Sequence, residues 1–304
     1  MTKEGDRGLN RREFMERSAK TMVIVALGSI LPISISLSSC SKDDENNIGK
    51  SIGKNKEKRG KAMGQRPAEN YYSERKVELL KNYDKMSKPL AKILVKRFDD
   101  KQANSISVEI RQEFEHIIPL IPYIGGETNL NTKNLIMASS CLAIYNVLKK
   151  HGQSAEGIGR IIYDLTETMV DYPKFILHLM GRLKYGQKYE KKIKKWAAET
   201  QKRKYPGDWV ATFIEGDRKE FDYGFDMTEC GILKFFRSQG AEEIVPYICV
   251  SMDGIFSQAM NRGLVRTITL AEGYDRCDFR YKMGRETNLL PLQNGWPPQF
   301  RTLS

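Results

Sequence analysis

The sequence predicts an α+β protein, in which an N-terminal helical region is followed by a four-strand antiparallel sheet interrupted by two helices. Two observations predict this class. Over residues 71–205 the apolar residues recur at helical spacing, whereas after Pro206 and Gly207 they alternate as in strands. Helices that precede a run of strands, instead of alternating with single strands, indicate an α+β arrangement.

Residues 1–40 have the composition of an export signal. A basic segment containing Arg11 and Arg12 precedes an apolar run that ends in small residues before Cys40. The paired arginines resemble a twin-arginine translocation signal, and Leu37–Cys40 resembles a bacterial lipobox, in which the cysteine is acylated. The apolar run is shorter than the ~18 residues of a spanning helix, and Pro32 interrupts it, which disfavours a simple membrane anchor. We therefore expect a lipid-anchored protein of the cell envelope of a Gram-negative bacterium, on the periplasmic or outer surface.

The charge of the chain is strongly positive, with a formal net charge of +12. Residues 41–70 are polar, basic and glycine-rich, and we interpret them as a flexible tether. Residues 181–205 hold much of the remaining basic excess, which indicates a solvated helix face more than an anionic partner. Export and the lack of a nucleic-acid-binding motif argue against nucleic acid. The expected partners are a small-molecule substrate and, through Cys40, a membrane.

The body of the chain divides into a helical region, 71–205, and an α+β region, 206–304, which we expect to pack as one unit. In the first region Pro89 bends or breaks a helix, Gly152 ends one and Ser154 begins another. In the second region, strands, a short helix that Thr228 caps, a longer helix and a second hairpin follow one another. The predicted elements are 208–216, 221–229, 229–240, 242–261, 264–273 and 275–283.

Three residues of this second region could carry chemistry. Cys230 falls in the first turn of a predicted helix, where backbone N–H groups and the helix dipole lower the pKa of a thiol. It is therefore the best placed nucleophile or metal ligand, although a small buried residue is an equal alternative. Asp253 borders the apolar stripe of the longer helix, four residues after Cys249, which we interpret as core. A carboxylate there needs a hydrogen-bonding partner or a catalytic role.

Cys277 belongs to a strand with clear alternation. Cys277, Phe279 and Tyr281 share one face, and Asp278 and Arg280 share the other. Periodicity alone makes Cys277 a core residue. The cysteines have no close metal-ligand spacing, and those of an exported protein can form disulfides. The cofactor stays open, a divalent metal included.

A group of motifs resembles the L-2-amino-thiazoline-4-carboxylic acid hydrolase family of bacteria. The pattern is a Thr-x-Cys after a strand, an Asp on the next long helix, and a closing Arg-Thr-x-Thr, Glu-Gly and Cys-Asp-Phe-Arg. These positions are Thr228, Cys230, Asp253, Arg266, Thr267, Thr269, Glu272, Gly273, Cys277, Asp278, Phe279 and Arg280.

The resemblance implies hydrolysis of a cyclic amidine, in which water adds at ring C2, the C–S bond opens and an N-carbamoyl amino acid forms. It implies Cys230 or Cys277 as nucleophile or ligand, Asp253 as general base, and Arg266 or Arg280, beside Asp278, as substrate-binding residues. The alternative is a non-catalytic small-molecule-binding lipoprotein. An enzyme requires Cys230, Asp253 and Cys277 to converge on one cleft with a lowered thiol pKa, whereas a binding module would have an apolar pocket with these residues at its periphery.

Overall fold

The structure, a computed structural model, describes residues 70–290 and 292. The predicted export signal, its Cys40 and the tether up to residue 69 lie outside the described residues. Within the described part, no helix is long and apolar enough to span a membrane.

The N-terminal half of the described chain is helical, as the sequence predicts. Its α-helices are α2 (Lys76–Met86), α3 (Lys88–Val95), α4 (Asp100–Ile117), α5 (Thr132–Lys150), α6 (Ala155–Met169), α7 (Lys174–Lys184) and α8 (Gln187–Thr200). Short 3-10 turns lie at η2 (Ser73–Arg75), η3 (Ile118–Leu120) and η4 (Gly126–Thr128).

Local sequence signals set several of these helix ends. Ser87 separates α2 from α3. Pro89 occupies the first turn of α3, where no helical hydrogen bond needs its missing N–H. Gly152, with φ of +78°, follows the end of α5. The Ser154 side chain then accepts a hydrogen bond from the Gly157 N–H at 3.1 Å and caps α6.

The sheet differs from the predicted four antiparallel strands. It has five strands in the order β1-β2-β4-β3-β5, and β5 runs parallel to β3. The predicted segment 264–273 forms only a three-residue strand, because Asp278 accepts the N–H groups of Thr267 and Ile268 and so ends the ladder. The strands are β1 (Val210–Glu215), β2 (Tyr223–Glu229), β3 (Leu264–Arg266), β4 (Cys277–Tyr281) and β5 (Asn288–Leu289).

The two helical segments inside the sheet region also differ in detail from the prediction. Thr228 does not cap the first helix, α9 (Gly231–Ser238), because it belongs to β2, and Cys230 occupies the N-cap position. The predicted helix over 242–261 is helical throughout 242–259 but irregular. It consists of η5 (Glu242–Ile244), α10 (Val245–Cys249), a π-helix η6 (Val250–Ile255) and α11 (Phe256–Ala259).

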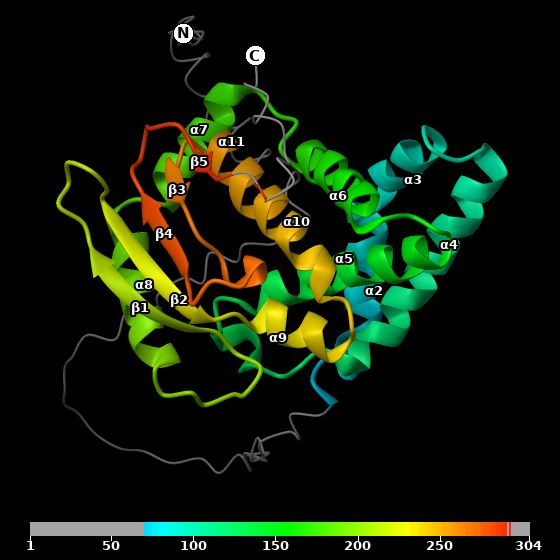
Figure 1. The fold of residues 1–304 in the computed structure, drawn as a ribbon, viewed down its shortest axis with the longest axis horizontal. Helices are drawn as coiled ribbons and strands as arrows, with labels where there is room; N and C mark the ends of the chain where they lie inside the picture. Colours follow the sequence, from blue (N-terminus) through cyan, green and yellow to red (C-terminus); the bar gives the residue numbers. More distant parts are fainter. Residues whose placement is uncertain (1–69, 291, 293–304) are drawn as a thin grey trace, which may run out of the picture. The chain divides into compact units, whose positions relative to one another are not determined.

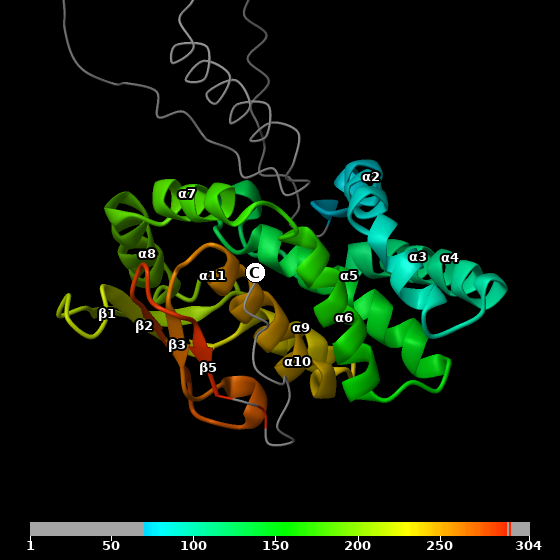
Figure 2. The ribbon, with the colours of Figure 1, turned by 90° about the horizontal axis from the view of Figure 1, so that it is seen from above.

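The described elements form a sheet beside a helical layer. Figures 1 and 2 both show the sheet on one side, α2 to α6 on the other, and the α9–α11 segment between them. Helix α8 packs against β1, and Trp196 of α8 meets Phe225 of β2 with ring centroids 5.6 Å apart. One continuous core, from Leu94 of α3 to Phe279 of β4, joins the two regions.

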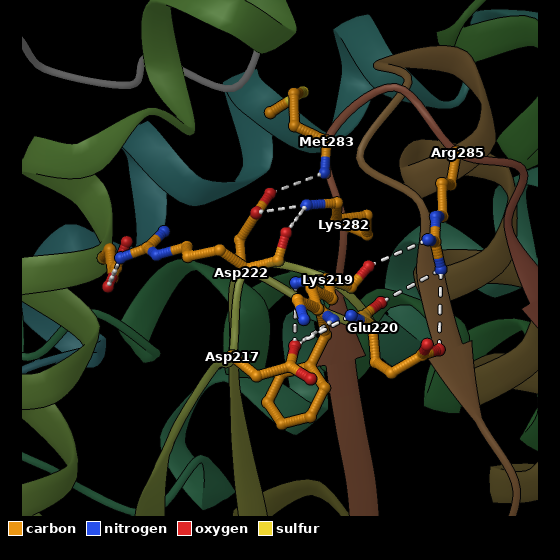
Figure 3. A network of polar contacts seen from close by, with 10 residues as sticks. Asp217, Lys219, Glu220, Asp222, Lys282, Met283 and Arg285 are labelled. Atoms are coloured by element: carbon orange, nitrogen blue, oxygen red, sulfur yellow. Dashed lines mark hydrogen bonds and ion pairs between the residues drawn. The ribbon is translucent and has the colours of Figure 1, made fainter.

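A polar network holds the β1–β2 turn against the end of β4 (Figure 3). Asp222 accepts hydrogen bonds from the Met283 N–H and from Lys282 Nζ, both at 3.0 Å. Arg285 donates to the carbonyl oxygens of Lys219 at 2.8 Å and Glu220 at 3.1 Å. The network therefore fixes the point at which Tyr281 leaves the sheet.

Candidate functional site

The inner face of the sheet is built by the alternation predicted for β4. Cys277, Phe279 and Tyr281 are buried, and Asp278 and Arg280 between them are half-exposed. In the register with β2, Cys277 lies opposite Met227, and Tyr281 opposite Tyr223. The inner face therefore presents one thiol at the end of an aromatic wall.

Arg280 and Asp278 lie on the other face of the sheet, so they do not meet Cys277 in one site. The Arg280 guanidinium pairs with Asp226 of β2, with Nη1 2.8 Å from Oδ1. The Asp278 carboxylate accepts hydrogen bonds from the N–H groups of Thr267, at 2.8 Å, and Ile268, at 2.9 Å. Both side chains are engaged with the protein itself, and their assignment to substrate binding stays a prediction.

Asp253 reaches the inner face from the π-helix η6. It forms an ion pair with Arg266 of β3, whose side chain is 2% exposed and lies over the Phe279 ring, 5.4 Å from its centroid. The Asp253 side chain remains 34% exposed. Burial raises the pKa of the Asp253 carboxyl, and the neighbouring Arg266 and Arg262 oppose that rise. A carboxylate that is partly exposed in this way is suited to moving a proton to and from a bound molecule.

At Cys230, burial affects the thiol pKa more strongly than the helix N-terminus does. The backbone N–H groups of Leu233 and Ile232 favour its thiolate, as expected for the first turn of α9. Burial is the larger effect and raises the pKa of the Cys230 thiol. The expectation of a lowered pKa, and hence of a reactive thiolate, is therefore wrong.

The other two thiols of this region are also neutral in the resting protein. Burial raises the pKa of Cys277 to about 12, although the Leu270 N–H donates to its sulfur at 3.2 Å. Burial likewise raises the pKa of Cys249 well above its ordinary value. Cys249 is half-buried at the edge of the core.

The thiols and the ion pair converge on one place. Cys230, Arg266 and Asp253 all act electrostatically on Cys277, and Cys249 interacts with the same groups. The sequence-based condition for an enzyme is met only in part. Cys230, Asp253 and Cys277 converge, but burial raises the pKa of both thiols instead of lowering it. Cys141, Cys230, Cys249 and Cys277 are free thiols.

The Thr-x-Thr…Glu-Gly motif has a structural role in this site. The Thr269 side chain accepts the Glu272 N–H at 3.2 Å and caps the short turn η7 (Leu270–Glu272). Gly273, with φ of +91°, closes that turn. The turn directs the Leu270 N–H at the Cys277 sulfur. Among the residues described, no group of three or more His, Cys, Asp or Glu side chains is placed to hold a metal ion.

Sequence reasoning missed a second cation beside this cluster. Arg262 lies between the rings of Tyr185 and Tyr281, with its Cζ 4.0 Å and 4.3 Å from their centroids. It also acts on Asp253. The only local signal is its place after Asn261, at the end of a predicted helix, and nothing in the sequence shows which rings surround it.

An apolar cavity lies away from the thiol cluster, within the helical layer. Its volume is about 20 Å³, room for about one water molecule. Met252 of η6 joins it to the neighbourhood of Asp253, but Cys230, Asp253 and Cys277 do not line it. A ring-sized ligand would need side chains to move before it could enter.

These features define an α+β protein with a candidate small-molecule site, made of a carboxylate, two arginines and neutral thiols, on the inner face of its sheet. The model of the L-2-amino-thiazoline-4-carboxylic acid hydrolase family matches residues 133–281. The match runs from α5 to the end of β4 and includes every residue of the cluster, and it supports the family that the motifs resemble. Neither a curated protein nor a solved structure matches the chain.

Proposed function

We propose that the protein is a hydrolase that opens the ring of a small cyclic amidine related to 2-amino-thiazoline-4-carboxylate. The observation that carries this proposal is the Asp253–Arg266 pair, with its carboxylate partly exposed beside three thiols. The family match over residues 133–281 supports a hydrolase.

Asp253 acts as the general base in this proposal. It accepts a proton from a water molecule while the water oxygen bonds to ring C2, and the C2–S bond then breaks. One proton of the water ends on the ring nitrogen and the other on the departing sulfur, so the product is an N-carbamoyl amino acid with a free thiol. Burial raises the pKa of Asp253, which makes it a stronger base than an ordinary aspartate.

The remaining residues of the cluster assist this proton transfer. Arg266, buried and paired with Asp253, positions the carboxylate and is not free to clamp a substrate. The neutral Cys277 thiol can donate a hydrogen bond to the departing sulfur, whereas its raised pKa disfavours attack as a thiolate. Cys230 borders the same space and is protonated in the same way.

We further propose that the protein works in the cell envelope, tethered to a membrane through an acylated Cys40. The support is the sequence alone: paired Arg11 and Arg12, an apolar run, and Leu37–Cys40. Metabolic labelling with a radioactive fatty acid should mark the wild-type protein and not a Cys40→Ala variant. Equal labelling of both would contradict the anchor.

The proposed reaction predicts that Asp253→Asn lowers turnover of 2-amino-thiazoline-4-carboxylate by a factor of about 10² or more, the usual effect of losing a general base. The measurement is thiol release by the purified full-length chain. Asp275→Asn is the matched control, because the Asp275 side chain is 75% exposed and contacts only Arg276 among the described ion pairs. It should keep wild-type turnover.

Loss of folding must be distinguished from loss of chemistry, because Asp253→Asn leaves the Arg266 charge buried without its partner. A double variant, Asp253→Asn with Arg266→Met, removes that charge, and circular dichroism checks that it folds. Wild-type turnover in either folded variant would overturn the assignment of Asp253. No turnover by the folded wild-type chain would favour the non-catalytic binding lipoprotein.

A further inference from the structure

Arg262 is held in place by the backbone at the end of α11. Asn261 has a positive φ of +52° and donates its N–H to the Gln258 carbonyl at 3.1 Å. The Arg262 N–H donates to the Ser257 carbonyl at 2.9 Å. These two hydrogen bonds are the Schellman pattern of a helix C-terminus. Gly263 follows with φ of +60°, and a Cβ there would lie 2.0 Å from the Lys282 carbonyl oxygen. These contacts fix the backbone position from which the Arg262 side chain extends.

Aromatic rings lie around this guanidinium, from Tyr185 directly after α7 and from α8, β2 and β4. Its Cζ is 4.0 Å from the Tyr185 centroid, 4.3 Å from that of Tyr281 and 5.9 Å from that of Tyr189. Tyr223 of β2 stacks on Tyr281 with centroids 5.2 Å apart and also acts on Arg262. We call Tyr185, Tyr189, Tyr223 and Tyr281 the tyrosine cage.

The cage leaves Arg262 without a neutralising anion. The groups that act on it most strongly are the four cage tyrosines, and burial raises the pKa of each phenol, so all are neutral at pH 7. No described carboxylate lies within ion-pair distance of Arg262, in contrast to Arg266 and Arg280. Its Nε is buried and has no hydrogen-bond partner in the described structure. Binding an anion would stabilise a half-buried cation that has no ion-pair partner and an unpaired N–H group.

A second cation, Lys184, lies over one of the cage rings. Its Nζ lies 4.8 Å from the centroid of Tyr185, the ring that also stacks on Arg262. Burial, and then repulsion by Arg262, lower the pKa of Lys184 to about 8. Two repelling cations that share one aromatic ring, without a described carboxylate between them, are the arrangement of an anion site.

We propose that Arg262 and Lys184 bind the carboxylate of a small organic acid, whose body packs against the tyrosine cage. The inference rests on the proposed function and deepens it, because it names the group that holds the substrate carboxylate. Arg262 also acts on Asp253, so a molecule held by Arg262 lies within electrostatic reach of the general base. The aromatic walls favour an organic acid over an inorganic anion.

Calorimetric titration of the full-length chain with 2-amino-thiazole-4-carboxylate tests this site. The aromatic ring of this probe resists addition of water, so binding is measured without turnover. The wild-type chain should bind it, and Arg262→Met should weaken binding by about tenfold or more, the loss of a charge-assisted hydrogen bond. Arg182→Met is the matched control, because Arg182 is exposed on the same helix as Lys184, and its affinity should equal that of wild type.

The outcomes separate this site from the hydrolase proposal. Probe binding that depends on Arg262, without any turnover by the wild-type chain, would keep the site and overturn the hydrolase. Unchanged affinity in a folded Arg262→Met variant, or no binding by wild type, would overturn the site whatever the turnover. Arg262→Lys keeps the charge and should retain part of the affinity, which guards against a folding defect. Inorganic phosphate that binds as tightly as the probe would overturn the assignment to a carboxylate.

The pH dependence of binding supplies a second readout. Lys184 interacts with Arg262, with Lys133 of α5 and with the ring of Tyr185. It is charged below about pH 8 and loses its charge above, so affinity for the probe should fall between pH 7 and 9. Lys184→Met should bind more weakly at pH 7 and lose most of this dependence. A wild-type affinity that is constant over this range would contradict the part assigned to Lys184.

Discussion

Two arginines beside Asp253 show how the surroundings of a residue decide its role. Arg266 is almost fully buried and its charge is neutralised by Asp253, so its role is to position that carboxylate. Arg262 is half-buried between tyrosine rings and meets no described carboxylate at ion-pair distance, so its charge is available to a ligand. The sequence shows two arginines four positions apart and cannot distinguish them, because the difference lies in ring partners from β4, from α8 and from Tyr185 directly after α7.

The thiol of Cys277 permits a direct test of the roles within the site. Because burial raises its pKa to about 12, its thiolate fraction at pH 7.5 is roughly a thousandfold smaller than that of an exposed cysteine. Iodoacetamide should therefore alkylate Cys277 in the native protein at least about tenfold more slowly than in urea-unfolded protein, with a rate that rises with pH. Mass spectrometry of the Cys277 peptide measures both rates, and the unfolded chain is the internal control. Rapid alkylation of the native thiol at neutral pH would restore Cys277 as a nucleophile.

At the scale of elements, the sequence predicted those features that depend on near neighbours. Ser154 and Gly152 set helix ends through contacts within a few residues, and β4 has the burial pattern that its alternation indicates. The sequence did not predict the π-helix around Asp253, because an extra residue in one helical turn leaves the apolar stripe nearly unchanged. It did not predict the β3–β5 pairing either, since these strands of three and two residues are too short for a periodic signal.

The packing of α7 on α11 positions the tyrosine cage, and Gly181 makes that packing possible. A Cβ at Gly181 would lie 2.0 Å from the Met260 carbonyl oxygen, a backbone atom that cannot move alone. Gly181→Ala should therefore push α7 away, lower the free energy of unfolding by about 1–3 kcal/mol, and weaken binding of the probe to Arg262. Urea unfolding and calorimetric titration measure the two effects.

The control for Gly181 is another helical glycine without a backbone clash. A Cβ at Gly157 of α6 would meet only side-chain atoms, the nearest being Ser154 Oγ at 3.3 Å. Gly157→Ala should leave stability unchanged or raise it by up to about 1 kcal/mol, because alanine favours the helix. Gly181→Ala with wild-type stability and affinity would show that the α7–α11 contact does not set the cage.

At the scale of the whole molecule, the described helical layer and sheet share one core. Phe114 of α4 is 1% exposed and stacks on Tyr83 of α2, and the same continuous cluster includes Phe236 of α9 and Phe279 of β4. The motif residues that resemble the family lie in the sheet region, yet the matched segment begins in α5. This agrees with a sheet whose inner face needs helices against it to enclose a site.

A shared core predicts that the described body unfolds as one cooperative unit. Far-UV circular dichroism, which reports mainly on the helices, and tryptophan fluorescence, to which Trp196 and Trp209 beside the sheet contribute, should give the same urea midpoint. Phe114→Ala, far from the sheet, should shift both midpoints together and lower the free energy of unfolding by about 3–5 kcal/mol. Val108→Ala, on the same helix but 56% exposed, should change it by no more than about 0.5 kcal/mol. If Phe114→Ala moved only the circular-dichroism transition, the helical layer would fold independently, and the thiol cluster would not depend on it.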